Sequence, residues 1–461
     1  MTSKIDNTLI SQEDTICAVA TAQGIGSISI IRVSGEDALK ISSKLLKSST
    51  PLIPRQASLK EIYDKDNNLI DKALVLYFAN PFSFTGEDIV EFQCHGGSGV
   101  ASIVLDTLLH FGARLAQNGE FSKRAFLNGK IDLSQAEAIS KLIEAKSDDA
   151  VKLLARQLKG ELIEFVEDIR SELIHVIASS EVSIDYADED LPKDLSDTIY
   201  TKLNSTLEIL NNTLSASQRR EGMLSGYKIA IVGKPNVGKS SLLNKLLSFN
   251  RAIVSDINGT TRDTIEENLK IGTHLIKIID TAGIREASDE IEKIGIQKSL
   301  EAIDEADIII ALFDRSNQID DDDMEILNQL KNQNSTQNKH IIYTLNKSDL
   351  EDKLRFDTYH SEKFLQISTK EDINDLIVSI EDLLDTTNSQ DETILVSKRQ
   401  ILALQNCIGS INSSFELLEN GELELFSFHI KESIEAISSI SRPYEYDDLL
   451  DNMFGNFCLG K

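Results

Sequence analysis

The stretch Gly233-Lys-Pro-Asn-Val-Gly238-Lys239-Ser240 constrains the fold more than any other feature of this chain. An apolar run, 229–232, comes directly before it, and a leucine-rich segment, 241–247, follows. This order predicts a strand, a glycine-rich loop and a helix, which is the context that a phosphate-binding loop requires. The glycines let backbone N–H groups converge on phosphate oxygens, and the N-terminus of the helix adds positive charge at the same point.

Within this loop we expect Lys239 to neutralise the β- and γ-phosphates of a nucleotide and the Ser240 hydroxyl to bind Mg²⁺. Asn236, Gly238 and Ser241 complete the predicted nucleotide contacts of the loop. An eight-residue pattern of this kind also occurs in unrelated α/β proteins, so it does not fix the function by itself.

Three further motifs follow in order, each directly after an apolar run that predicts a strand: Asp280-Thr281-Ala282-Gly283, Asn346-Lys347-Ser-Asp349 and Ser368-Thr369-Lys370. Open parallel sheets bind their ligands at these strand ends. The Asp349 carboxylate can accept hydrogen bonds from the ring N–H and the exocyclic amine of guanine, a donor pair that adenine lacks. Taken alone, Asp349 could also be an ordinary helix N-cap. The four motifs together predict a GTP-binding domain.

The position that carries a catalytic glutamine in Ras-type GTPases holds Ile284, which cannot orient a water molecule. Another group must supply stabilisation comparable to an arginine finger, about 10³- to 10⁵-fold in rate, or roughly 4–7 kcal/mol. A cation between the phosphates could supply it. Asn236 and the segment 255–263 are placed to hold one, and Thr261 is the expected second hydroxyl ligand of Mg²⁺.

Beyond these motifs, the chain resembles the MnmE (TrmE) family of bacterial tRNA-modification GTPases over essentially its whole length. The GTPase motifs indicate only a superclass, whereas the C-terminal tetrapeptide combined with the N-terminal segments is specific. The segments that carry the resemblance are Phe84-Thr-Gly-Glu-Asp88, Cys94-His-Gly-Gly97, the stretch 120–130, Gly259-Thr-Thr-Arg-Asp263, the stretch 280–290 and Cys458-Leu-Gly-Lys461.

For the GTPase domain, the resemblance implies activity that K⁺ stimulates when two such domains meet across a homodimer. The K⁺ ligands of the family fall on Asn236, Ser255, Ile257 and Thr260. The glutamate that orients the attacking water falls on Glu292. From the sequence alone, Glu292 is one acid among several on a polar helix face.

For the N-terminal domain, the resemblance implies dimerisation and binding of a one-carbon donor, 5,10-methylene-tetrahydrofolate, with 5-formyl-tetrahydrofolate as an analogue. The corresponding residues are Arg32, Glu91, Lys130 and Lys461. Cations can pair with the carboxylates of folate, and a carboxylate can accept from the amine edge of a pterin. Cys458 is a candidate for the chemistry itself.

The resemblance also implies a flavoprotein partner, MnmG (GidA), in a heterotetramer. Together the two proteins would add an aminomethyl or carboxymethylaminomethyl group to C5 of the wobble uridine of certain tRNAs, with GTP hydrolysis driving domain rearrangement. Two other classes stay open. One is a ribosome-assembly GTPase, although such proteins usually append a basic RNA-binding domain that is not found here. The other is a folate-dependent transferase acting on a small molecule.

The formal net charge of −28 argues against a chain that binds tRNA strongly by itself. Affinity for nucleic acid comes mostly from basic surface, but the charge runs here are acidic, such as 320–323 and 188–190. We expect most of this acid to be a solvated face. We therefore expect tRNA to bind mainly with the partner. No flavin fingerprint is present, because the glycines Gly24 and Gly26 lead into a strand-like run, 28–32, and not into a helix.

Cysteine spacing and hydropathy predict a cytoplasmic protein. The four cysteines are scattered without Cys-x-x-Cys spacing, which favours a reducing compartment and no structural zinc. No apolar run approaches the roughly 18 residues that span a bilayer. We therefore expect no membrane association.

The fold class predicted is multidomain, α/β and α. Residues 1–128 form an α+β folate-binding and dimerisation domain, 226–384 a Ras-like P-loop GTPase domain, and 129–225 with 385–461 the two parts of a helical bundle around it. Ser134-Gln-Ala-Glu137 predicts a capping box. Apolar residues at three- and four-residue spacing between Val151 and Ile177 predict one long amphipathic helix.

Overall fold

The computed structural model describes all residues except 1–13, 23, 25, 48–49, 186–193, 220, 250–266, 280–302, 304, 338, 354–362, 387–392, 443–452, 456, 458–459 and 461. The chain divides into two compact units. The first unit contains residues 1–140, 166–171 and 434–461, and the second contains residues 141–165 and 172–433.

The first unit is built on a six-stranded sheet with the strand order β3-β4-β5-β2-β1-β6. Its neighbours are antiparallel except for β1 and β6, which run parallel. The elements are β1 (Ile16–Val19), β2 (Ile28–Ser34), α1 (Ala38–Leu46), β3 (Ser58–Tyr63), β4 (Leu69–Phe78), β5 (Ile89–His95), α2 (Ser98–His110), β6 (Arg114–Leu115), α3 (Glu120–Leu127) and α4 (Leu133–Glu144).

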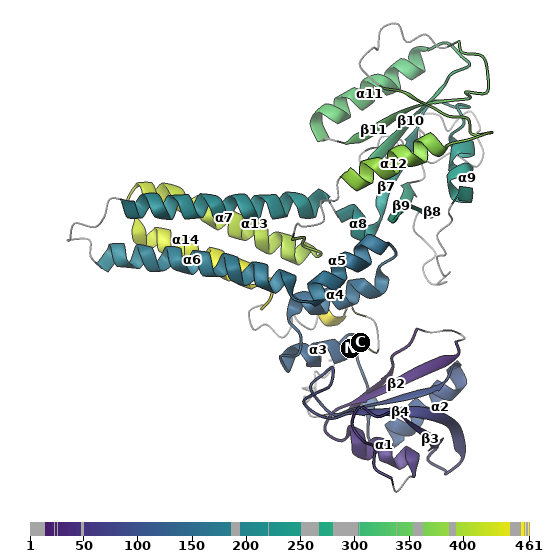
Figure 1. The fold of residues 1–461 in the computed structure, drawn as a ribbon, viewed down its shortest axis with the longest axis vertical. Coiled ribbons are helices and arrows are strands. Elements are labelled where there is room, and N and C mark those ends of the chain that lie inside the picture. Colours follow the sequence, from purple (N-terminus) through teal and green to yellow (C-terminus); the bar gives the residue numbers. More distant parts are fainter. Residues whose placement is uncertain are drawn as a thin grey trace, which may run out of the picture. The chain divides into compact units, whose positions relative to one another are not determined.

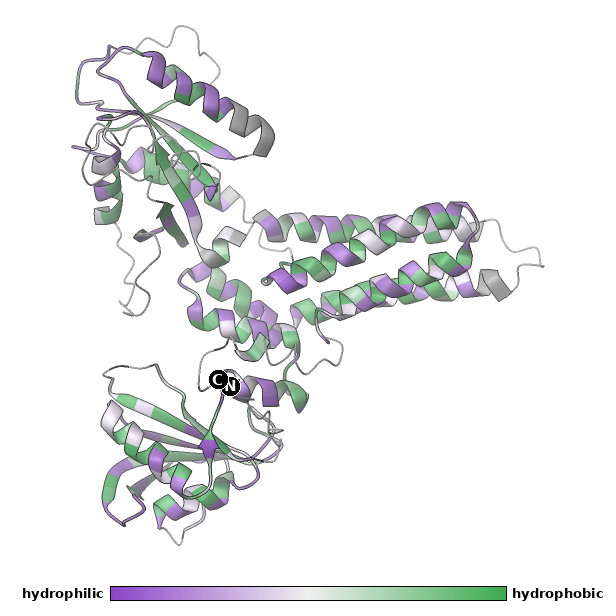
Figure 2. Ribbon diagram, turned by 180° about the vertical axis from the view of Figure 1, so that it is seen from behind, coloured by the Kyte–Doolittle hydropathy of each residue, from purple (hydrophilic) through white to green (hydrophobic). Residues whose placement is uncertain are grey.

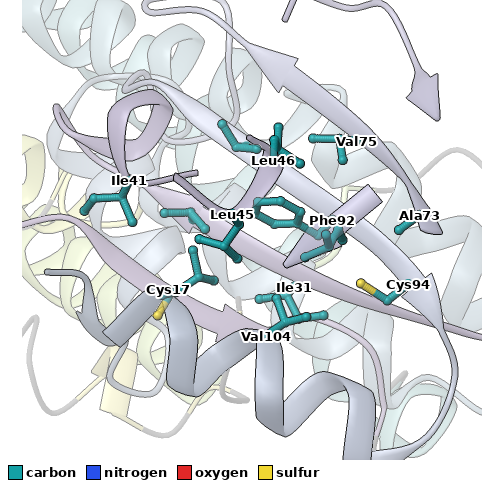
Figure 3. Close-up of a cluster of buried hydrophobic side chains, with 14 of the residues drawn as sticks. Cys17, Ile31, Ile41, Leu45, Leu46, Ala73, Val75, Phe92, Cys94 and Val104 are labelled. Carbon is teal, nitrogen blue, oxygen red and sulfur yellow. The ribbon is translucent and has the colours of Figure 1, made fainter. Parts of the chain in front are cut away.

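One face of this sheet is buried under α1 and α2. Ile31, Val75 and Phe92 point from the strands into a common core with Leu45 of α1 and Val104 of α2 (Figure 3). Side chains alternate between the two faces of a strand, so their neighbours in sequence point the other way. On that second face Leu59 and Leu74, which pair across β3 and β4, remain 59% and 42% exposed.

Helix α4 begins differently from the prediction. The carboxylate of Asp132 accepts hydrogen bonds from the backbone N–H groups of Ser134 (2.7 Å) and Gln135 (3.1 Å), and the Gln135 side chain accepts one from the N–H of Asp132 (3.0 Å). The capping box therefore joins Asp132 and Gln135. The predicted box from Ser134 to Glu137 was wrong, because Ser134 already lies inside the first turn of the helix.

The second unit contains a helical part in which segments far apart in sequence pack together. The hydroxyls of Ser180 and Ser427 lie 3.0 Å apart, and the rings of Tyr200 and Phe415 are 5.1 Å apart. The helices that follow the second sheet in sequence thus return to those that precede it (Figure 1). These helices are α5 (Asp148–Leu158), α6 (Glu161–Asp185), α7 (Asp194–Arg219), α8 (Glu221–Ser225), α13 (Lys398–Glu419) and α14 (Leu423–Ser438).

The long helix predicted from Val151 to Ile177 was wrong. The chain forms two helices, α5 and α6, with a break at Gly160, whose φ of +95° lies in the left-handed region that favours glycine. The apolar spacing continues across the break, because both helices bury one face. Figure 2 shows hydrophobic and hydrophilic residues alternating around the bundle helices.

The second sheet has the strand order β12-β11-β10-β7-β9-β8, and all neighbours are parallel except β8 and β9. All seven residues of β10 are buried. The mixed α/β class is therefore confirmed. The elements are β7 (Tyr227–Val232), α9 (Lys239–Phe249), β8 (Glu267–Ile271), β9 (His274–Ile279), β10 (Ile308–Asp314), α11 (Asp321–Gln337), β11 (His340–Asn346), β12 (Leu365–Gln366) and α12 (Asn374–Thr386).

Across the described part of the chain, no helix combines the length and the apolar character needed to span a membrane.

Candidate nucleotide-binding site

The glycine-rich loop runs from the end of β7 to the start of α9, as the sequence predicts. Asn236 has a φ of +64° and Gly238 a φ of +107°, so the loop turns through the left-handed region twice. A Cβ atom on Gly238 would lie 2.3 Å from the side-chain nitrogen of Asn346. Only glycine therefore allows the phosphate loop to approach the loop that follows β11.

Lys239 is directed back into this loop. Its ammonium donates to the carbonyl oxygens of Gly233 (2.7 Å) and Lys234 (2.8 Å), and burial lowers the pKa of Lys239. Ser240 and Ser241 follow on the first turn of α9, where the N-terminal N–H groups of a helix favour anions. A cation and a helix N-terminus thus face the same space.

The loop after β11 ties the phosphate loop to the loop after β12. The Asn346 amide donates to the carbonyl of Val237 (2.8 Å) and accepts from the backbone N–H of Thr369 (3.1 Å). The neighbouring Lys347 ammonium donates to the carbonyl of Asn236 (3.1 Å). Asn346 and Lys347 thereby hold the phosphate loop close to the loop that follows β12.

The predicted base-reading residues also meet. The Asp349 carboxylate accepts a hydrogen bond from the Ser368 hydroxyl (2.9 Å), and the Lys370 ammonium lies 3.9 Å from its other oxygen. A carboxylate held in this way can accept from the donor pair of guanine. The arrangement joins two motifs that are 19 residues apart in sequence.

Asp314 belongs to this site, although no sequence motif pointed to it. It ends β10, and its carboxylate accepts from the Lys347 ammonium (2.6 Å) and the Ser316 N–H (2.9 Å). Burial opposes ionisation, but these hydrogen bonds outweigh it and hold the pKa of Asp314 below its usual value. An acid that ends a fully apolar strand at the ligand edge was the available signal.

Several predicted residues lie outside the described residues, and the structure says nothing of them. The segment before β8 contains Ser255, Ile257, Thr260 and Thr261. The segment after β9 contains Asp280, Thr281, Ala282, Gly283 and Glu292.

A second polar cluster lies on the first unit. The Arg32 guanidinium donates to the Glu91 carboxylate at 2.8 Å, across the paired strands β2 and β5. The same guanidinium lies over the rings of Phe84 (5.7 Å) and Phe121 (5.6 Å). Arg32 is thus held by one charge and two aromatic faces, an arrangement that keeps its planar head fixed.

Lys130 reaches the same region. A Cβ on Gly86, whose φ is +80°, would lie 2.9 Å from Cε of Lys130, so the lysine stem packs directly on this glycine. The loop 84–86 therefore touches both Arg32 and Lys130. Gly460 packs as closely on the carbonyl of Val19, on the strand next to Arg32. Its neighbours Cys458 and Lys461, both predicted site residues, lie outside the described residues.

A partly buried ion network, to which no sequence motif pointed, supports this cluster. Arg124 pairs with Glu87 (3.1 Å) and with Glu120 (3.2 Å), and Arg114 pairs with Glu120 at 2.6 Å. Burial opposes ionisation of Glu120, but the hydrogen bonds from Arg114 and from the N–H of Gln117 hold its pKa below the usual value. The network fastens α3 beside the loop that carries Phe84.

The glycine-rich loop, the carboxylate predicted to read guanine and the largely parallel sheet that aligns them define a P-loop GTPase. Family models agree over most of the chain: "GTP-binding protein TrmE N-terminus" matches residues 15–130, and "MnmE helical domain" matches residues 133–458.

Curated relatives give the same result over the full length. The tRNA modification GTPase MnmE of Aliarcobacter butzleri is 60% identical, over 98% of this chain and 100% of that protein. The protein of the same name from Sulfurimonas denitrificans is 58% identical, over 97% and 100%. Among solved structures, Aquifex aeolicus Era bound to GDP and aluminium fluoride is 25% identical and covers 40% of this chain and 66% of that chain, with a TM-score of 0.26. The chain belongs to the MnmE (TrmE) family, and it is a GTP hydrolase involved in tRNA modification.

Proposed function

We propose that this GTPase, acting in the cytoplasm with a flavoprotein partner (MnmG/GidA), adds a carboxymethylaminomethyl or aminomethyl group to C5 of the wobble uridine of certain tRNAs. The one-carbon unit comes from 5,10-methylene-tetrahydrofolate. The observation that carries the proposal is the ion pair of Arg32 and Glu91 on the first sheet, beside the loop 84–86 on which the Lys130 stem packs.

The chemistry of this cluster suits a folate. The glutamate tail of folate is anionic and pairs with cations such as Lys130 and the terminal Lys461. The pterin is a flat ring with an amine edge, from which the Glu91 carboxylate can accept hydrogen bonds. Phe84 and Phe121 beside Arg32 supply apolar faces for a planar ligand.

For the nucleotide site we propose Mg²⁺ bound by Ser240 and Thr261, and K⁺ bound by Asn236, Ser255, Ile257 and Thr260. Oxygen donors are the ligands that hard cations take, and Asn236 is exposed on the phosphate loop. K⁺ would supply the charge stabilisation that a Ras-type glutamine and an arginine finger supply elsewhere. Glu292 would orient the attacking water.

We also propose that the protein is a homodimer that joins its flavoprotein partner in a heterotetramer. The second face of the N-terminal sheet supports a dimer, because Leu59, Leu74 and Ile28 leave apolar area exposed there. The net charge of −28 supports binding of tRNA mainly with the partner, which would contribute the basic surface.

Nucleoside mass spectrometry of tRNA from a strain that lacks the gene tests the proposal, with complementation by variants. Arg32→Ala should fail to restore the modified wobble uridine while keeping the GTPase rate of the wild type. Lys72→Ala, an exposed cation on β4, serves as the matched control and should restore the modification. Wobble uridines that stay fully modified without the gene would refute the proposal.

The ion is tested separately, by GTPase rates in K⁺ and Na⁺ at matched ionic strength. We expect the wild type to be much faster in K⁺, and Glu292→Ala to be slow in both salts. Equal rates of the wild type in the two salts would remove K⁺ from the mechanism, and an active Glu292→Ala would remove Glu292.

A further inference from the structure

The second residue of the phosphate loop, Lys234, is anchored outside the loop. Its ammonium lies 2.6 Å from a carboxylate oxygen of Asp320 and 2.6 Å from one of Asp323. The Lys234 side chain is only 12% exposed and that of Asp323 only 3%. A buried ammonium with two carboxylate partners is held far more rigidly than a lysine on an open surface.

Both carboxylates belong to the start of helix α11. Asp320 accepts from the backbone N–H of Asp323 (3.1 Å), and Asp323 accepts in return from the N–H of Asp320 (3.4 Å), which is a reciprocal capping box. Asp321 and Asp322 between them are exposed. Most of the acid in the run 320–323 is thus exposed, as predicted, whereas Asp323 is buried and pairs with Lys234 of the phosphate loop.

The backbone of Lys234 holds the phosphate-binding lysine. Its carbonyl oxygen accepts from the Lys239 ammonium at 2.8 Å, next to the 2.7 Å bond to the carbonyl of Gly233. A continuous series of contacts thus leads from the capping box through the Lys234 side chain and its peptide group to Lys239. The position of the Lys239 ammonium depends on where this peptide lies.

We propose that Lys234 is a positioning residue for GTP hydrolysis: the α11 capping box fixes its side chain, and its carbonyl sets the place of the Lys239 ammonium. No step of the reaction involves Lys234 itself. The inference depends on the GTPase activity of the family and not on K⁺, folate or the partner. A displacement of about 1 Å of a catalytic group can cost about 100-fold in rate, so a loose anchor has a large effect.

The test replaces Lys234 in the full-length chain and measures GTP hydrolysis. Lys234→Met keeps the aliphatic stem but removes the ammonium, and we expect kcat/KM to fall about 10- to 100-fold. Lys234→Arg can keep both ion pairs and should retain most of the rate. Asp322→Asn removes an exposed charge from the same turn of α11 and is the matched control. A wild-type rate for Lys234→Met would overturn the proposal.

Lys234→Met leaves the buried Asp323 without its cation, so a second variant separates positioning from folding. Lys234→Met with Asp323→Asn removes both charges together and should be as thermally stable as the wild type or nearly so. We expect this double variant to hydrolyse GTP as slowly as Lys234→Met. Recovery of the full rate would show that the ion pairs serve the stability of α11 alone.

A double-mutant cycle on GDP affinity then tests the route through Lys239. If Lys234 acts by placing the Lys239 ammonium, Lys234→Met weakens GDP binding in the wild type but has little further effect in a Lys239→Ala background. The same fold-loss in both backgrounds would show that Lys234 acts by another route, and the proposal would fail.

Discussion

The two six-stranded sheets place polar side chains in opposite ways. In the parallel sheet β10 is buried along its whole length, and the functional residues stand in the loops at the strand ends. In the N-terminal sheet one face is buried under α1 and α2, the other is covered only in part, by Phe84 and Phe121, and Arg32 and Glu91 project from the strands themselves on that second face. A parallel sheet brings its strand ends to one edge, whereas an open sheet face exposes side chains along the whole strand.

Because of this difference, the residues of the nucleotide site are close together in sequence, whereas those of the N-terminal cluster are far apart. The nucleotide site is a set of short motifs, because each loop is one continuous segment after a strand. The N-terminal cluster joins residues that are 59 positions apart, Arg32 and Glu91, with a lysine from another loop. Single charges on strands look like any surface charge, so only family resemblance pointed to them.

The largest expected effect is on the phosphate loop. Lys239→Ala removes the cation at the phosphates, and we expect a loss in GTP hydrolysis comparable to that of an arginine finger, about 10³- to 10⁵-fold. Binding of 5-formyl-tetrahydrofolate, measured by calorimetry, should not change, because the proposed folate site lies on the other sheet. Lys245→Ala, on the same helix α9 but with its ammonium on an exposed carbonyl, is the control. A parallel loss of folate binding would mean that the two sites are not independent.

The next effect tests the covered face of the N-terminal sheet. Phe92 is fully buried in the core under α1 and α2. We expect Phe92→Ala to cost about 3–5 kcal/mol of the stability of the first unit, through lost burial and the cavity that remains. Hydrogen exchange should rise in β2 and β5 and stay unchanged in β7 and β10. Equal loosening of both sheets would contradict their description as separate cores.

Sequence patterns predicted the strands of the second sheet better than they predicted helix breaks and buried ion pairs. Apolar runs placed β7, β9 and β11, since a largely buried parallel strand is mostly apolar. The run 364–367 also placed the short β12, although its two residues are half-buried and exposed. These patterns did not reveal the break at Gly160, because apolar spacing continues from α5 into α6 on both sides of it. Nor did they reveal Asp314 or Asp323 as buried partners of lysines, because such pairing depends on tertiary contacts between segments that are 33 or more residues apart.

Acid should weaken the first unit through Glu120. Hydrogen bonds from Arg114 and from the N–H of Gln117 overcome the opposing effect of burial and hold the folded-state pKa of Glu120 below its unfolded value of about 4.3. Its contribution is therefore complete above that value and is lost as pH falls towards the folded pKa. Glu120→Gln should be less stable than the wild type at pH 7, and the difference should shrink below about pH 4. Urea unfolding followed across this pH range checks it, and a constant difference would exclude the ion pair as the cause.

The smallest effect on stability is expected for Leu74, which lies on the opposite face of the N-terminal sheet from Phe92. Leu74 lies on β4 and is 42% exposed, pointing away from the core to which Val75 contributes. Leu74→Thr keeps a residue that suits a strand, so the free energy of unfolding should change by no more than about 0.5 kcal/mol at protein concentrations where the monomer dominates.

At higher concentrations the same variant should shift the monomer–dimer equilibrium towards monomer in analytical ultracentrifugation, because the proposed dimer covers this face. Lys60→Ser on β3, a neighbouring strand position whose side chain belongs to the opposite face, is the control for the dimer measurement. A Leu74→Thr protein that unfolds as easily as Phe92→Ala would mean that this face is a second core, and one that dimerises normally would place the dimer contact elsewhere.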